Sequence, residues 1–523
     1  MPSDLVPIRY RSPGSLGLVT DEEGSAIDPA WAVVLTNAVI SKANRVTARD
    51  GWNMLTSSPH SDDTEALYEF VEDSSNTFII SAAGLKLYSG TATLTDRTGA
   101  APATQTAPTA NDWQFVTLAD CCIGFQESHE PILFEPDSAA GTPSIATQAA
   151  DFEDISNTTG YAGSAPQGDA AIATHGRIFA FDSTKRTIQW CALLQPQVWT
   201  GAGTGSIGLD NIWPIGTDIG VALVEWNDFL VVFGERSVLL FTGLNDPATN
   251  LTIAATTTAS GQADAIASDG LVARDAVVSV GTDLVFMSRS GLRSLSRALV
   301  GDNLPFSSLA PHIQLQLTEE IDTAIGNGDP IRIEYHRPLS AIVARIGDNY
   351  WYFDVRTLGQ IRASKWEGID WKSAKSIQGV LYLGQNGGVA DYSTNQDDTA
   401  SYTFKYQSPW IPITGQANRT LIGKEAHIYY ESDVDRVINL DWSWDYTGQS
   451  FNDSQVLDTT DAAEWGTGEW GEDEWGTNPT LSVLTHDLAG EGSLLQFCSS
   501  TIIDGGTFGI QQIEIFGKLG KLG

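Results

Sequence analysis

Residues 221–243 read VALVEWNDFLVVFGERSVLLFTG, which is three short apolar runs separated by two polar pairs. The runs are rich in Val, Leu, Phe and Trp, which favour strands, and the pairs Asn227-Asp228 and Glu235-Arg236 fall where the chain must reverse. Apolar density this high indicates strands that are covered on both faces. Small antiparallel sheets stacked face to face bury such strands without exposing an edge.

Similar strand triplets start near residues 67, 114, 170, 221, 276 and 341. A loose period of about fifty residues with three or four strands per unit is typical of a β-propeller. The six units predict six blades over residues 61–400, and the strands expected at 380–393 supply the last strands or close the ring. Low-complexity stretches at 100–111 and 139–168 are expected to be surface loops without a core.

The two ends of the chain differ from the repeats. In the N-terminal segment, residues 1–60, Asp28-Pro29 predicts the start of a short helix from Trp31 to Leu35, and residues 44–52 alternate like a strand. Longer strands over residues 401–523 predict a separate antiparallel β-sandwich, or platform, on which the N-terminal segment packs. The predicted fold class is therefore mainly β, a six-bladed propeller with an additional β-sandwich domain.

Two patterns are candidates for a subunit or partner interface. The tripeptide Glu-Trp-Gly occurs three times at a spacing of five, and its indoles are those of Trp465, Trp470 and Trp475. These rings either pack back on the sandwich or anchor a subunit interface, where Trp is enriched. A second pattern is an apolar stripe on a helix expected near residues 309–326, which packs on its own domain or faces a partner subunit. Its members are Ile313, Leu317, Ile321 and Ile325.

Charge is the strongest compositional feature, with 65 acidic and 29 basic residues and a formal net charge of −36. A chain this acidic is not expected to hold nucleic-acid phosphates. The charge indicates either a highly soluble protein, as in a saline habitat, or a surface that DNA passes without sticking. No apolar stretch is long enough to span a membrane and the N-terminus lacks the apolar core of a signal peptide, so we expect synthesis and assembly in a cytosol.

Motifs for catalysis, cofactors and metals are not found in the sequence. The seven histidines are scattered singly, the four cysteines make no CxxC pair and are expected to be buried thiols, and no acidic cluster has the spacing of a calcium loop. The best enzyme alternative is a glycan-degrading or carbohydrate-binding propeller that recognises a host receptor, because glycosidases place carboxylates at such sites. The repeated Asp-rich turns of sialidase blades are missing, so we expect no enzyme activity and no cofactor.

Several short motifs, in their joint order, resemble one family. They are NRVTARDGWNML at 44–55, RIF at 177–179 with QWCALLQPQVW at 189–199, FLVVFGERSVLLFTG at 229–243, SRSGLRSLSR at 288–297 and FGIQQIEIFGKLG at 508–520. This order is similar to the tail nozzle proteins, also called tubular tail or tail hub proteins, of short-tailed bacteriophages. The family usually ends in Gly-Arg, whereas this chain has Gly520-Lys521.

The resemblance implies a structural role in the virion. It implies a ring of six identical chains at the tail tip, assembled in the host cytoplasm and joined to the adaptor ring of the head-to-tail connection. Tail fibres would attach near its upper rim, and genomic double-stranded DNA would pass its central channel without sequence-specific binding on its way through the host cell surface. The residues that line or gate that channel are not identified by the resemblance.

Overall fold

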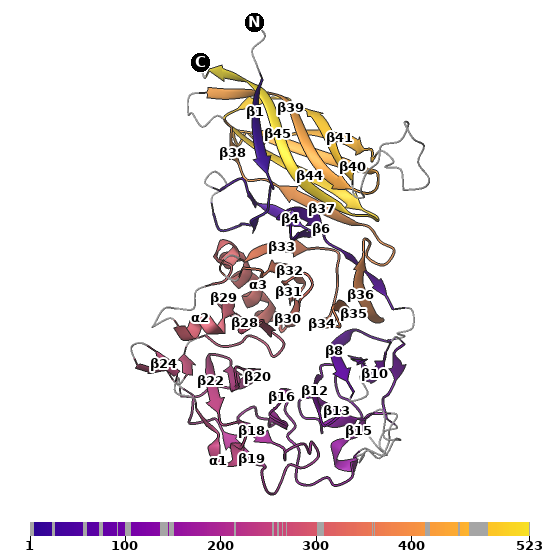
Figure 1. Cartoon of the computed structure of the whole chain (residues 1–523), viewed down its shortest axis with the longest axis vertical. Helices are drawn as coiled ribbons and strands as arrows, with labels where there is room; N and C mark the ends of the chain where they lie inside the picture. The colour runs from indigo at the N-terminus through magenta and orange to yellow at the C-terminus, as the bar shows by residue number, and fades with distance from the viewer. Residues whose placement is uncertain are drawn as a thin grey trace.

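Strands dominate the computed structural model, which Figure 1 shows as an elongated body with small sheets in a ring at one end and long strands at the other. The structure describes residues 5–22, 27–55, 60–72, 77–91, 93–99, 106–135, 145, 151–213, 216–253, 256–258, 261–263, 265–267, 269–300, 308–357, 359, 361–413, 419–447, 450–459 and 480–521. Within these ranges, no helix combines the length and the apolar character that crossing a bilayer requires.

Five of the six predicted triplets lie in separate sheets and the sixth is one end of a larger sheet, so the six-bladed arrangement is confirmed. The first blade contains β8 (Thr64–Val71), β9 (Thr77–Ala83), β10 (Lys86–Gly90) and β11 (Thr95–Asp96). The second blade contains β12 (Gln114–Leu118), β13 (Cys121–Phe125), β14 (Ile132–Phe134) and β15 (Glu153–Asp154). The third blade contains β16 (Ala171–Thr174), β17 (Arg177–Phe181), β18 (Thr187–Trp190) and β19 (Gly205–Gly208). The fourth blade contains β20 (Gly220–Trp226), β21 (Phe229–Gly234), β22 (Ser237–Thr242) and β23 (Thr252–Ile253).

The fifth and sixth blades carry the main helices of the described chain. The fifth blade contains β27 (Val277–Val280), β28 (Asp283–Ser288) and β29 (Gly291–Ser294), and α2 (Leu295–Val300) follows it. The sixth blade contains β30 (Ile331–His336), β31 (Ala341–Ile346), β32 (Asn349–Asp354) and β33 (Arg362–Trp366). Between them lie a 3₁₀ turn, η2 (Pro311–Ile313), and α3 (Gln314–Asn327). Smaller additions beside the fourth blade are α1 (Pro247–Asn250), the hairpin β24 (Thr256–Thr258) and β25 (Gly261–Ala263), and β26 (Ala265–Ala267).

A further sheet closes the ring between the sixth blade and the first. It contains β34 (Ser373–Ile377), β35 (Val380–Gln385) and β36 (Gly388–Thr394), and its outermost strand is β7 (Gly51–Met54) from the N-terminal segment. Because β34 contacts both β30 and β8, the six blades and this closing sheet together place seven innermost strands around the axis. The strands predicted at 380–393 therefore close the ring, with β7 as their partner.

The sequence explains why these strands stack. In β13, β17 and β28 every residue is buried, as expected for middle strands covered on both faces. Neighbouring blades meet through such side chains, and the rings of Phe233 and Phe286, from the fourth and fifth blades, lie 5.2 Å apart. The turn at Asn227 and Asp228, with φ of 48° and 63°, is of the kind whose twist matches a two-residue hairpin.

Two larger sheets make up the C-terminal end of the molecule, together with strands of the N-terminal segment. One contains β42 (Thr480–Asp487), β39 (Arg419–Ser432), β45 (Phe508–Lys521), β6 (Val46–Ala48), β5 (Ala38–Ile40), β1 (Val6–Arg11) and β43 (Glu491–Gly492). The other continues the sixth blade from β33 through β4 (Val34–Thr36), β37 (Tyr402–Gln407), β44 (Leu494–Ile503), β40 (Arg436–Trp444) and β41 (Ser450–Leu457), with β38 (Ile411–Pro412) beside β44. The sheets contact one another through aromatic side chains, including Phe404 and Phe508 at 5.1 Å.

The helix predicted from Trp31 to Leu35 is wrong. These residues form β3 (Trp31–Ala32), which pairs with β2 (Gly17–Leu18), and the start of β4, which pairs with β33 and β37. The Asp28 carboxylate does accept a hydrogen bond from the N–H of Ala30, at 2.8 Å, but it closes a turn and not a helix. Pairing with distant strands overrides the local helix-start signal here.

The expectation of a coreless loop over residues 139–168 is also wrong for its described part. Residues 153–154 form β15, the outermost strand of the second blade, and the 3₁₀ turn η1 (Ile155–Asn157) follows it. Phe152 and Ile155 are fully buried and belong to two of the apolar clusters between blades. Ala165 is buried in one of these clusters as well, and Ile145 and Tyr161 pack against it, so apolar side chains along the stretch hold it against the ring.

A buried ion pair joins the N-terminal segment to the chain between β36 and β37. The guanidinium of Arg49 donates to both oxygens of Asp397, at 2.8 and 2.6 Å, and to Asn37 Oδ1 at 3.0 Å. Its side chain is completely buried and lies 4.1 Å from the ring centroid of Tyr402. This pair sits where the propeller meets the C-terminal sheets, so it fixes the joint between them.

Candidate functional site: the axis of the propeller

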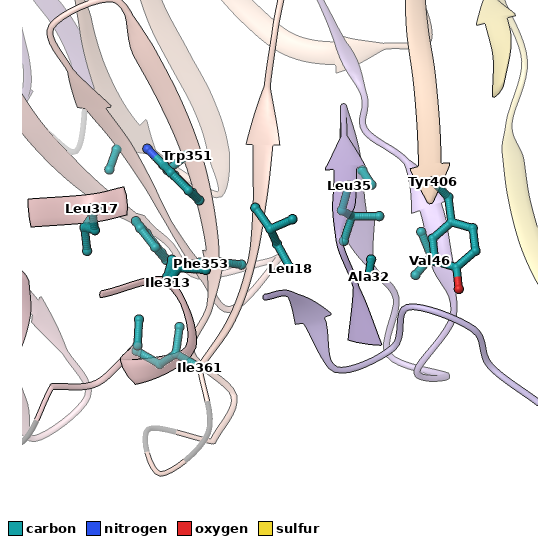
Figure 2. Packing of buried hydrophobic residues seen from close by; sticks show 14 of the residues in the cluster. Leu18, Ala32, Leu35, Val46, Ile313, Leu317, Trp351, Phe353, Ile361 and Tyr406 are labelled. Carbon is teal, nitrogen blue, oxygen red and sulfur yellow. The ribbon is translucent and has the colours of Figure 1, made fainter. Parts of the chain in front are cut away.

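The helical stripe predicted as an interface lies in the core instead. Ile313, Leu317 and Ile321 are each fully buried, because α3 packs on β29 and β31 of its own propeller. Figure 2 shows Ile313 and Leu317 in one apolar cluster that also contains residues of the N-terminal strands. These three residues are therefore not available to a partner subunit, and this part of the interface prediction is wrong. The other candidates, Trp465, Trp470 and Trp475, lie outside the described residues.

The axis of the propeller holds a cavity of about 260 Å³. Residues from all seven innermost strands, or from the segments just before them, line it. Charged side chains are concentrated where these strands begin, and they come from blades on different sides of the ring. The charged lining residues are Glu65, Arg274, Asp275, Arg332, Glu334 and Lys375.

Arg274 reaches across the axis. It precedes β27 of the fifth blade, yet its Nη2 lies 2.6 Å from Asp112 Oδ1, before β12 of the second blade. Its Nη1 donates to the main-chain oxygen of Asp169, before the third blade, at 3.2 Å. A bond to Asp275 at 2.9 Å completes its partners, and its side chain is only 7% exposed. One guanidinium thus ties the second, third and fifth blades together.

Arg332 makes a second link beside it. This residue lies on β30 of the sixth blade, and its Nη2 is 3.2 Å from the same Asp112 oxygen. Its Nη1 donates to the main-chain oxygen of Glu65 on the first blade, and the Glu65 carboxylate lies 3.7 Å away. We call Arg274, Arg332, Asp112, Asp275 and Glu65 the axial ion-pair network. The network joins four blades, and the bond of Arg274 to the main-chain oxygen of Asp169 adds a fifth. It lies beside the axial cavity where the innermost strands begin.

Electrostatics within the axial ion-pair network favour the charged forms. Burial opposes ionisation of Arg274, but Asp275 and Asp112 outweigh burial, so the pKa of this guanidinium lies well above its ordinary value. Burial alone would raise the pKa of Asp275, whereas Arg274 and Arg332 lower it to about 2. Burial raises the pKa of Glu65 in spite of Arg332. Arg274 and Asp275 are therefore charged at neutral pH, and their charges compensate one another.

The axis of the propeller is lined by carboxylates and cations, and the four cysteines lie outside this lining. Its cations are paired with carboxylates, and the four cysteines are buried elsewhere, where burial raises the pKa of the Cys191 and Cys498 thiols to about 11. No group of three or more His, Cys, Asp or Glu side chains in the described ranges is placed to hold a metal ion. What the axial arrangement does is hold blades together across the ring.

Sequence reasoning missed the axial ion-pair network, although a repeated signal was present. An aspartate stands two residues before the first strand in all six blades, at Asp62, Asp112, Asp169, Asp218, Asp275 and Asp329. Its spacing follows the blade period. The arginines gave no such signal, because a lone Arg before a strand does not reveal a partner on the far side of a ring.

No family model matches the chain, and no curated protein matches it. Among solved structures it is similar to the computationally designed Ika8 protein, with 12% identity and TM-score 0.35 over 65% of this chain and 98% of that one. The AfRom2 CNH domain matches with 9% identity and TM-score 0.36 over 66% and 99%. YCF48 from Cyanidioschyzon merolae matches with 9% identity and TM-score 0.39 over 65% and 98%. Likenesses this distant carry no argument about function, and the propeller assignment rests on the strand pairing.

Proposed function

We propose that this chain is a tail nozzle subunit of a short-tailed bacteriophage. Six copies form a ring that closes the tail tip, attaches to the adaptor ring and carries tail fibres. Genomic double-stranded DNA passes through the lumen between the subunits into the host. The subunit acts as a structural part of the virion and not as an enzyme.

The observation that carries this proposal is the paired charge at the axis of the propeller, where Arg274 and Arg332 bind carboxylates of other blades. A propeller that binds or converts a ligand commonly needs free polar groups at its axial cavity, which is where pockets form in a ring of sheets. Here Arg274, Arg332 and their carboxylate partners use those groups to bridge blades. A propeller stiffened in this way is suited to be a building block, and DNA would then travel outside it, in the lumen of a ring.

The joint between the two ends of the molecule supports the same role. A continuous sheet runs from the sixth blade through β4 into β37 and β44, and the fully buried Arg49 fixes the crossing point. A subunit that must hold its place under the pressure of DNA exit benefits from such a rigid connection. We propose that the two C-terminal sheets form a sandwich-like platform, which meets the adaptor ring and neighbouring subunits.

Charge supports the role as well. Six copies of a chain with a formal charge of −36 give a ring that repels phosphates over a Debye length of about 8 Å at physiological salt. DNA would therefore meet no strong electrostatic trap on its way out. The charge favours passage of DNA through the ring and opposes binding of DNA to it. We therefore expect the isolated protein to leave double-stranded DNA unshifted in a gel at physiological salt.

Cryo-electron microscopy of the purified virion tests the proposal. The expected result is a six-fold ring at the tail tip into which the propeller and the C-terminal sheets fit as one body. Particles from a strain with a stop codon in the gene should lack this density and should fail to retain or deliver DNA. Virions without the chain, or with the chain at a site away from the tail tip, would contradict the proposal.

A further inference from the structure

A groove of about 620 Å³ lies between β41 and β42, at the edges of the two C-terminal sheets and far along the chain from the propeller axis. This volume falls in the range of about 300–1,000 Å³ found for small-molecule sites. Both apolar and polar side chains line it. Among the lining residues are Trp442, Phe451, Asn452, Asp453, Gln455 and Asp487.

The aromatic part of the groove is held in place by backbone contacts. The rings of Trp442 and Phe451 stack at 5.8 Å with 16° between their planes, and Phe451 is half-buried. The indole N–H groups of Trp442 and Trp444 both donate to the main-chain oxygen of Ala489, at 2.9 and 3.0 Å. Gly490 follows with φ of +101°, and a Cβ there would lie 2.5 Å from Trp444 Nε1. The turn over the indoles is therefore tightly fitted.

The polar wall of the groove is also ordered before any ligand binds. Asp453 Oδ2 accepts hydrogen bonds from His486 Nδ1 at 2.9 Å and Gln455 Nε2 at 2.8 Å, and Oδ1 accepts one from the N–H of Ser454. Gln455 Nε2 also donates to a main-chain oxygen of β42, which links the two strands across the groove. A carboxylate held by three donors keeps further lone pairs for a ligand hydroxyl.

We propose that this groove binds a neutral oligosaccharide. A sugar ring offers an apolar C–H face to the aromatic surface of Phe451, and its hydroxyls donate to carboxylates such as Asp453 and Asp487. Because the groove is acidic, sialylated or phosphorylated glycans are repelled and neutral ones are favoured. The groove belongs to the C-terminal sheets, so this binding does not depend on six chains forming a ring.

The test uses the full-length purified chain on an array of neutral and sialylated glycans, followed by calorimetric titration with the best neutral ligand. The groove variant is Asn452→Ala with Asp487→Ala. The matched control is Asn439→Ala with Asp458→Ala, which makes the same chemical change at exposed positions outside the groove. All variants are first compared for thermal unfolding.

We expect binding to neutral members of the array only. Loss of two polar partners should raise Kd about tenfold or more, with the control within about twofold of the wild type. No binding to any neutral glycan would overturn the inference, and so would equal affinity of the groove variant and the wild type, or a preference for sialylated glycans. Because the isolated chain is tested, failure here leaves the tail nozzle proposal standing, and failure of that proposal leaves this binding to be measured separately.

Discussion

Replacing Arg274 with Met should destabilise the propeller without changing its fold. The Arg274→Met side chain fills a similar volume but removes one of the two cations that Asp112 and Asp275 share at the axis, so that only Arg332 remains. Removing one partner of a fully buried ion pair costs about 3–5 kcal/mol. Here Asp112 and Asp275 are 46% and 34% exposed, so water screens part of the loss, and we expect about 2–3 kcal/mol.

Urea denaturation followed by tryptophan fluorescence measures this loss, and the surface pair Arg186–Asp210 provides the control. Those side chains are 51% and 57% exposed at 3.4 Å, so Arg186→Met should cost less than about 0.5 kcal/mol. A double-mutant cycle of Arg274→Met and Asp112→Asn should give a coupling energy above about 1 kcal/mol. Equal losses for Arg274→Met and Arg186→Met would refute the idea that the axial ion-pair network holds the blades together.

Three further predictions concern other buried groups. Arg49→Met should cost about 3–5 kcal/mol in the same assay because it leaves Asp397 buried without its partner. Lys86→Met, in an exposed pair, should leave the urea midpoint unchanged, and comparable losses for the two variants would argue against a fixed joint. Burial lowers the pKa of His60 and of His312 to about 4, against about 6.5 when unfolded, so the unfolded chain binds more protons between these values. The free energy of unfolding should therefore fall as pH drops from about 6.5 to 4, by up to about 3 kcal/mol per histidine. His60→Gln should remove part of that fall, and urea midpoints that stay constant over this range would show the shifts to be absent. All four thiols are buried, so iodoacetamide should label none in the native protein and all four in urea, as mass spectrometry would show.

The blades could be predicted from sequence because each one is a local pattern. In residues 221–243 the apolar runs, the polar pairs and the turn at Asn227-Asp228 are contiguous, and the structure places strands and turns there. The same argument failed for residues 31–35, where the helix-start signal of Asp28-Pro29 is equally local. The strand β4 exists because it pairs with Lys405, Tyr406 and Gln407, more than 360 residues away. Local propensity carries no information about a partner at that distance.

The candidate site could not be predicted for a related reason. Arg274 and Asp112 are 162 residues apart, and they meet only because the ring closes and turns both strand starts toward one axis. The composition showed a large negative net charge, but it predicted only an acidic outer surface and no ion pairs at the axis. The repeated aspartate before each first strand was the one available clue, since Asp112 and Asp275 at this position belong to the axial ion-pair network.

The repeated aspartates do not share one role. Asp112 binds arginines from two other blades, and Asp275 binds its neighbour Arg274 and lies 3.9 Å from Arg332 of the sixth blade. Asp218 binds Ser237 and the N–H of Arg236 within its own blade. The same residue type thus serves a cross-ring link at some positions and a local turn at others. A ring of equivalent pockets would keep these carboxylates alike and free for a ligand. Because they are instead divided between two kinds of internal bond, the proposed function leads us to expect recognition of partners on the outer surfaces and on the C-terminal sheets and not at the axis.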